Sequence, residues 1–163
     1  MNCACYAVNP SDAAPVLLAL DARIVTTKRM LSAEEFFEVH VLSNTALDPD
    51  EIITEIQIPA AKEGEKSIYK RFAFRKSIDF PVVNLAIRRS ADGETRISLN
   101  AVAPVPIRCR KAEAVVNGKE ITEELAAAAG EAALEGAEPF EANRYKIQIA
   151  KTLVKRTLLE LAK

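Results

Sequence analysis

The stretch FPVVNLAIRRSADGETRISLNA, residues 80–101, decides the fold of this chain. Two runs rich in β-branched and apolar residues, 80–89 and 95–103, flank the sequence ADGE at 91–94, whose Asp-Gly pair is typical of a β-hairpin turn. A third run of this kind lies upstream, at 66–75. The sequence therefore predicts three consecutive antiparallel strands.

Helical patterns follow these strands. The run 108–116 ends at an Asn-Gly pair, Thr122 stands where it can cap a helix over 123–134, and apolar residues recur at helical spacing through 143–162. Three strands followed by three helices predict an α+β sandwich, with the helices packed on one face of the sheet.

The first part of the chain offers fewer elements. A short helix is expected over 13–20, and strands over 22–27 and 51–59. A unit of about 60 residues buries little surface and is marginally stable alone. We therefore expect the tail of a larger domain at 1–59 and an α+β domain at 60–163. Unpaired sheet edges in the first part also favour a homo-oligomer.

Composition excludes several classes of protein. Hydrophobic residues make up 49% of the 163 residues and the formal net charge is −1, so a basic nucleic-acid binder is not expected. No apolar run approaches the roughly 18 residues of a membrane span, and the first residues lack a signal-peptide pattern. With three cysteines, too few for a disulfide scaffold, the sequence predicts a cytoplasmic protein.

Motifs for independent catalysis are missing. The five glycines form neither a dinucleotide-binding nor a P-loop pattern. His40 is the single histidine, and Cys3, Cys5 and Cys109 are too few and too far apart for a zinc or iron–sulfur site. We therefore predict no catalytic residue and no metal ligand, and find no support for a hydrolase or a transferase.

A few residues stand out without a motif. Arg71 and Arg75 are four apart in a predicted strand, so they would share one face and could hold a phosphate or a carboxylate. On the strand pattern alone, a solvated sheet face is the favoured explanation. Ile53 is apolar on an otherwise polar strand face. Asp12 precedes a predicted helix, where capping alone accounts for it.

Short motifs in a fixed order give the chain a family resemblance. They are AVNPSD (7–12), ALDA (19–22), LDPDEII (47–53), IQIP (56–59), YKRF (69–72), DFPVV (79–83), APVP (103–106), NRYK (143–146) and LVKR (153–156). Together they resemble the C-terminal half of the FAD-binding medium subunit of molybdenum hydroxylases, a family that includes xanthine dehydrogenases and carbon monoxide dehydrogenases. The resemblance spans nearly the whole chain.

The resemblance implies both a fold and a function. The fold is a three- or four-stranded antiparallel sheet with about three helices, preceded by a partial flavin-binding lobe. The function is that of an oxidoreductase subunit, in which FAD takes electrons from iron–sulfur clusters and passes them to an acceptor. The implied partners are a molybdopterin-binding large subunit and a [2Fe–2S] small subunit.

The resemblance also implies site residues. Asp12 matches an aspartate that contacts the flavin, and Ile53 an aliphatic residue packed on the isoalloxazine ring. Arg71 stands where the family usually has lysine, near the polar edge of the ring, and Arg75 and Asp79 belong to a loop beside it.

The loops that hold the FAD pyrophosphate in this family are expected upstream of Asn9. We therefore expect this chain alone to be inactive and to bind no flavin. Three explanations stay open: another chain supplies the upstream half of the site, the gene is split, or the chain is a truncated relic. The alternative is an interaction or assembly domain without a cofactor. Bound flavin in the presence of the upstream half would distinguish the two.

Overall fold

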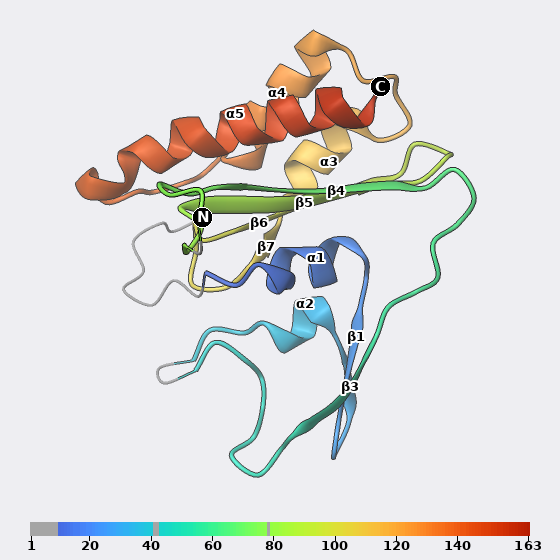
Figure 1. The fold of residues 1–163 in the computed structure, drawn as a ribbon, viewed down its shortest axis with the longest axis vertical. Helices are drawn as coiled ribbons and strands as arrows, with labels where there is room; N and C mark the ends of the chain where they lie inside the picture. The colour runs from blue at the N-terminus through green and yellow to red at the C-terminus, as the bar shows by residue number, and fades with distance from the viewer. Residues whose placement is uncertain (1–9, 41–42, 78) are drawn as a thin grey trace.

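The computed structural model describes residues 10–40, 43–77 and 79–163. The larger of its two sheets has four antiparallel strands in the order β4 (Lys66–Phe72), β5 (Val83–Arg89), β6 (Thr95–Asn100) and β7 (Ile107–Arg108). Figure 1 shows this sheet as the central layer of the molecule. The predicted α+β fold with an antiparallel sheet is confirmed.

One face of the large sheet is covered by α3 (Arg110–Val116), α4 (Glu123–Ala133) and α5 (Arg144–Leu161) (Figure 1). The Thr122 side chain accepts a hydrogen bond from the backbone N–H of Leu125 at 3.2 Å, so it caps α4 as predicted. The core lies between the sheet and these helices. Its largest fully buried side chains include Leu85, Ile87, Ile97, Leu99, Val116, Val154 and Leu158.

The opposite face of the large sheet is covered by α1 (Ala13–Ala19), which lies against β5 and β6 (Figure 1). This face is buried but polar, since Asn84, Ser98 and Asn100 are all inaccessible. The Ser98 hydroxyl donates to the carbonyl of Pro15 at 2.8 Å. Polar side chains here bind the backbone that enters α1, which joins the first part of the chain directly to the sheet.

A smaller sheet has the strand order β2 (Met30–Ser32), β1 (Arg23–Thr26), β3 (Ile53–Gln57), and α2 (Ala33–Phe36) follows β2. All its pairings are antiparallel. Every residue of β3 is exposed, and β3 is an edge strand. Within the described part of the chain, β3 therefore has little cover, whereas Ile24 and Thr26 of β1 are buried.

The strand predicted over 66–75 ends at Phe72, so placing Arg71 and Arg75 on one strand face is wrong. The ladder between β4 and β5 ends at the pair Phe72↔Val83, closed by the N–H of Val82, which donates to the carbonyl of Phe72 at 2.8 Å. Arg75 lies in the loop beyond, where its N–H donates to Asp79 at 3.1 Å.

The strand predicted over 95–103 also ends early, at Asn100. Ala101 has a φ of 62°, a left-handed conformation that takes the chain out of the sheet. The chain returns as β7, in a region where the sequence predicted the start of a helix at residue 108. The helix begins at Arg110 instead.

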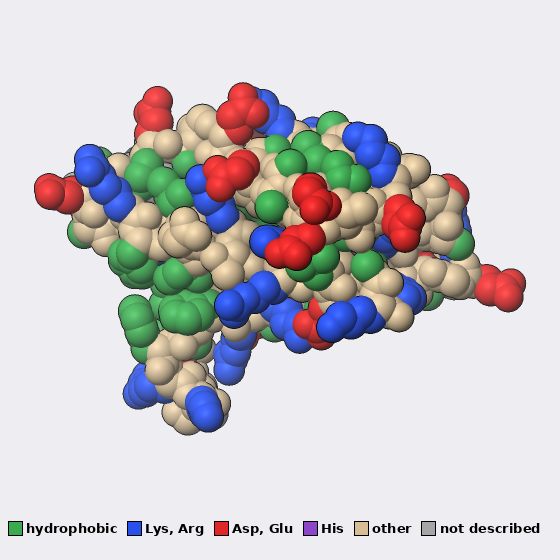
Figure 2. Space-filling model, turned by 90° about the horizontal axis from the view of Figure 1, so that it is seen from above, with side chains coloured by type: hydrophobic (Ala, Val, Ile, Leu, Met, Phe, Trp, Pro, Cys, Tyr) green, Lys and Arg blue, Asp and Glu red, His purple; other side chains and the backbone are tan. Residues whose placement is uncertain are grey.

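Figure 2 looks onto the helix layer, where acidic and basic side chains are interspersed. That mixture agrees with a formal net charge of −1. Over the described ranges, no helix is both long and apolar enough to cross a membrane.

Candidate functional site

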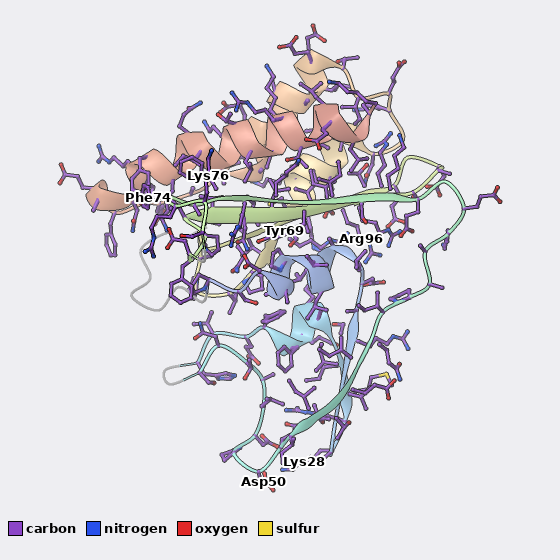
Figure 3. The ribbon with its side chains drawn as sticks, viewed as in Figure 1. Lys28, Asp50, Tyr69, Phe74, Lys76 and Arg96 are labelled. Atoms are coloured by element: carbon purple, nitrogen blue, oxygen red, sulfur yellow. The ribbon has the colours of Figure 1, made fainter. Side chains whose placement is uncertain are left out.

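A pocket of about 620 Å³ lies where β4 ends and the chain enters α1. Its lining consists of Pro10, Asp12, Arg71, Arg75, Lys76, Ser77, Asp79, Phe80 and Pro81. Four of the five site residues predicted from the family resemblance are among them. Figure 3 shows Phe74 and Lys76 at this end of β4, and Tyr69 on the α1 side of the strand.

Asp12 and Arg71 form the polar centre of the pocket. Arg71 Nη1 lies 3.5 Å from Asp12 Oδ2, and both side chains are partly exposed, at 35% and 52%. The same nitrogen donates to the carbonyl of Asp79 at 3.2 Å. Arg71 therefore connects the start of α1 with the loop that follows β4, and leaves a carboxylate and a guanidinium side by side at the surface of the pocket.

Tyr69 and Asn84 support this pair from within the sheet. The Tyr69 hydroxyl donates to Asp12 Oδ1. Asn84 Nδ2 donates to the carbonyl of Ser11 at 2.9 Å and to the Tyr69 hydroxyl at 3.3 Å. Burial, together with the hydrogen bond to Asp12, raises the pKa of Tyr69 to about 12.

Sequence reasoning missed both of these residues. A usable signal was present for Tyr69, because it is two residues from Arg71 and so shares its strand face. For Asn84 the signal was weaker. An amide inside an otherwise apolar strand suggests a buried partner, but only the register Arg71↔Asn84 places it beside this site.

Asp79 organises the loop rather than facing the pocket with free oxygens. Its Oδ2 accepts from the N–H of Arg75, and its Oδ1 accepts from the Arg75 guanidinium and from the N–H of Phe80, all at 3.0–3.1 Å. The neighbouring Arg75 guanidinium holds the pKa of the Asp79 carboxyl below its usual value. The loop thus presents the exposed side chains of Arg75, Lys76 and Phe80.

Ile53 lies elsewhere. It is 39% exposed on β3 of the small sheet, opposite Thr26, and is not part of the pocket lining. In Figure 1, β3 lies toward the end of the molecule remote from the helix layer. The structure therefore brings together Asp12, Arg71, Arg75 and Asp79, and leaves Ile53 apart from them.

The remaining chemical candidates lie outside this site. Cys109 is buried, which raises the pKa of its thiol to about 12. His40 lies at the surface, 3.4 Å from Glu38. Cys3 and Cys5 fall outside the described residues. Within the described part of the chain, no three metal-ligating side chains come together.

Comparison with known proteins gives this geometry a context. Residues 67–161, more than half of the chain, match the model of the CO dehydrogenase flavoprotein C-terminal domain. The chain belongs to this flavoprotein family of molybdenum hydroxylases. Residues 4–61 match the FAD-binding domain in molybdopterin dehydrogenase, which confirms the predicted resemblance over nearly the whole chain.

Individual relatives belong to the same family of flavoproteins. The aldehyde oxidoreductase FAD-binding subunit PaoB of Escherichia coli is 30% identical over 96% of this chain and 50% of its own length. The carbon monoxide dehydrogenase medium chain of Hydrogenophaga pseudoflava is 31% identical over 92% of this chain and 56% of its own. A solved structure of the Hydrogenophaga pseudoflava enzyme superimposes with a TM-score of 0.81 at 30% identity, over 94% of this chain and 56% of that one.

The chain thus spans about half the length of these relatives. The pocket lies at the junction of the two matched segments. Asp12 comes from the segment that matches the FAD-binding domain, and Arg71, Arg75 and Asp79 come from the segment that matches the C-terminal domain. A site built from both segments depends on their contact.

Proposed function

We propose that this chain forms the C-terminal part of an FAD site in a molybdopterin-dependent dehydrogenase or hydroxylase. The observation that supports this most directly is the pocket in which Asp12 and Arg71 meet across the junction of the two family segments. A carboxylate and a guanidinium side by side suit the edge of a heterocycle that carries both hydrogen-bond donors and acceptors.

In this proposal each residue of the site has a separate role toward the flavin. Asp12 and Arg71 face the polar edge of the isoalloxazine, Arg75 adds a cation from the adjacent loop, and Asp79 holds that loop in shape. Ile53 lies on the small sheet outside the pocket lining, and its packing on the ring is proposed from the family resemblance alone. The cofactor, when bound, would take up and pass on electrons, and the chain's residues would bind it, orient it and set its electrostatic surroundings.

The proposed partners rest on the family to which the chain belongs. We infer a molybdopterin-binding large subunit and a [2Fe–2S] small subunit. Electrons would pass from the iron–sulfur clusters through FAD to an acceptor. The proposed location is the cytoplasm. The isolated chain is proposed to hold no flavin, because backbone N–H donors for the pyrophosphate would come from the upstream half.

The test is flavin binding with and without the upstream half of a close relative. The chain alone should purify colourless, and the complemented protein should bind FAD and quench its fluorescence. If flavin binds, Arg71→Ala should lower its reduction potential, because a cation stabilises the anionic reduced ring more than the neutral oxidised ring. After solvent screening of this partly exposed group, about 1 kcal/mol, or roughly 20 mV for two electrons, is expected.

Lys70→Ala is the matched control. Lys70 lies on the opposite face of β4 and pairs with Glu160 of α5 at 2.8 Å, so its loss should leave the flavin potential unchanged. Equal effects of the two substitutions would refute the assignment of Arg71. A complemented protein that assembles without flavin would favour the alternative, an interaction domain without a cofactor.

A further inference from the structure

The two oxygens of the Asp12 carboxylate have different neighbours. Oδ1 accepts from the Tyr69 hydroxyl and lies 3.5 Å from Asn84 Nδ2. Oδ2 lies 3.5 Å from Arg71 Nη1. One oxygen is therefore bound from inside the sheet, while the other is paired with the cation that lines the pocket.

The inner partners are held rigidly. Tyr69 pairs with Ala86 in the ladder between β4 and β5. Asn84 is completely buried, and its amide also binds the carbonyl of Ser11 at 2.9 Å. Asn100 donates to the same carbonyl at 2.7 Å. The sheet thus fixes both the backbone before Asp12 and one of its carboxylate oxygens.

A carboxylate needs such a partner if it is to keep one orientation. Rotation of an aspartate about χ2 is broad, so its two oxygens exchange places easily unless one of them is held. Arg71 alone cannot hold Asp12, because it is partly exposed and its Nη1 is shared with the carbonyl of Asp79.

We propose that Tyr69 is the positioning residue of this site: by occupying Asp12 Oδ1 it directs Oδ2 toward Arg71 and the pocket. The orienting role of Tyr69 requires neither a cofactor nor a partner. Its consequence for a flavin rests on the proposed function. Tyr69 stands behind Asp12, outside the pocket lining, and acts only through that carboxylate.

The first measurement needs no cofactor. We expect ultraviolet titration to give a tyrosine step near pH 12 that is lost in Tyr69→Phe and kept in Tyr145→Phe, the matched control on α5. In Asp12→Asn this step should move to lower pH, although burial keeps it above the usual value of 10.0. An unchanged step in Asp12→Asn would overturn the proposal.

A second readout avoids extreme pH. At pH 7 the ring carbon that bears the Tyr69 hydroxyl should give a 13C NMR resonance whose chemical shift reports the hydrogen bond to Asp12. The resonance should disappear in Tyr69→Phe, shift in Asp12→Asn and keep its position in Tyr145→Phe. An unchanged chemical shift in Asp12→Asn would also overturn the proposal.

The third measurement concerns the cofactor. In the protein complemented with the upstream half, Tyr69→Phe should weaken FAD binding about tenfold, while Tyr145→Phe leaves it unchanged. Equal binding by Tyr69→Phe and the unmodified protein would overturn the role toward flavin. If the unmodified complex itself binds no FAD, the proposed function fails, and the orienting role of Tyr69 is then decided by the titration and the NMR resonance.

Discussion

At the scale of single residues, Glu51 is a buried carboxylate whose two oxygens both accept hydrogen bonds. Arg29 donates to both of its oxygens at 3.0 Å, the Thr26 hydroxyl donates at 2.6 Å and the N–H of Asp48 at 3.0 Å. Its side chain is inaccessible in the folded chain. These groups connect β1, the loop after it and the approach to β3.

Stability should therefore depend on pH in the acid range. The Arg29 guanidinium, the Thr26 hydroxyl and the Asp48 N–H lower the pKa of Glu51 from 4.5 to about 2. Because the folded value is lowered, the stabilisation is present above pH 4.5 and is lost as the pH falls toward 2. Chemical denaturation of Glu51→Gln should show lower stability at pH 7 and a flatter pH dependence between 4.5 and 2.

The exposed Glu55 provides the control. Glu55→Gln, on β3, should leave both the stability and its acid dependence nearly unchanged. If Glu51→Gln and Glu55→Gln gave the same acid profile, the network around Glu51 would not be the source of the effect.

At the scale of elements, the contact between α4 and α5 is unusually close at one point. A Cβ built on Gly130 would lie 2.8 Å from the carbonyl oxygen of Lys151, which is backbone and cannot simply swing away. The small residues of α4 thus allow the two helices to approach. Gly130 has a packing role, although glycine lowers intrinsic helix stability.

Gly130→Ala should consequently destabilise the chain, by about 1–3 kcal/mol, because the strain of overpacking exceeds the gain in helix propensity. Thermal unfolding followed by circular dichroism measures the effect. The exposed Ala128 of the same helix serves for calibration, since Ala128→Gly should cost only about 1 kcal/mol through propensity. A rise in Tm for Gly130→Ala would show that the helices do not approach this closely.

At the scale of the whole molecule, the two sheets are covered very differently. The large sheet lies between the helix layer and α1 (Figure 1). The small sheet, in contrast, exposes a group of isoleucines along its edge strand and the residues that flank it. The most exposed are Ile52, Ile56 and Ile58, at 67%, 47% and 51%. An uncovered apolar edge strand favours pairing with another strand.

We therefore expect the isolated chain to self-associate through β3 as its concentration rises. Ile56→Lys should shift sedimentation velocity profiles toward monomer, because a charged edge opposes strand pairing. Phe140→Lys changes an equally exposed hydrophobic residue near the start of α5 and should leave the profile unchanged. Association that is insensitive to Ile56→Lys but abolished by Phe140→Lys would place the contact on the helix layer instead.

The sequence by itself determined the α+β class, the order of three strands and three helices, and the family. These depend on local information: alternation in the strands, the Asp-Gly turn, the Thr122 cap and the helical stripe over 143–162. Two further statements stay predictions. One is the division into domains at 1–59 and 60–163, and the other is the role toward flavin of Asp12, Ile53, Arg71, Arg75 and Asp79.

Only the tertiary structure decided where those residues lie. Periodicity placed Arg75 on a strand, but pairing with β5 ends at Phe72, and Arg75 lies in a loop held by Asp79. The Asp12–Tyr69 hydrogen bond joins residues 57 apart in sequence. Such contacts depend on the packing of α1 against the polar face of the large sheet, and no local pattern encodes a distance between elements so far apart along the chain.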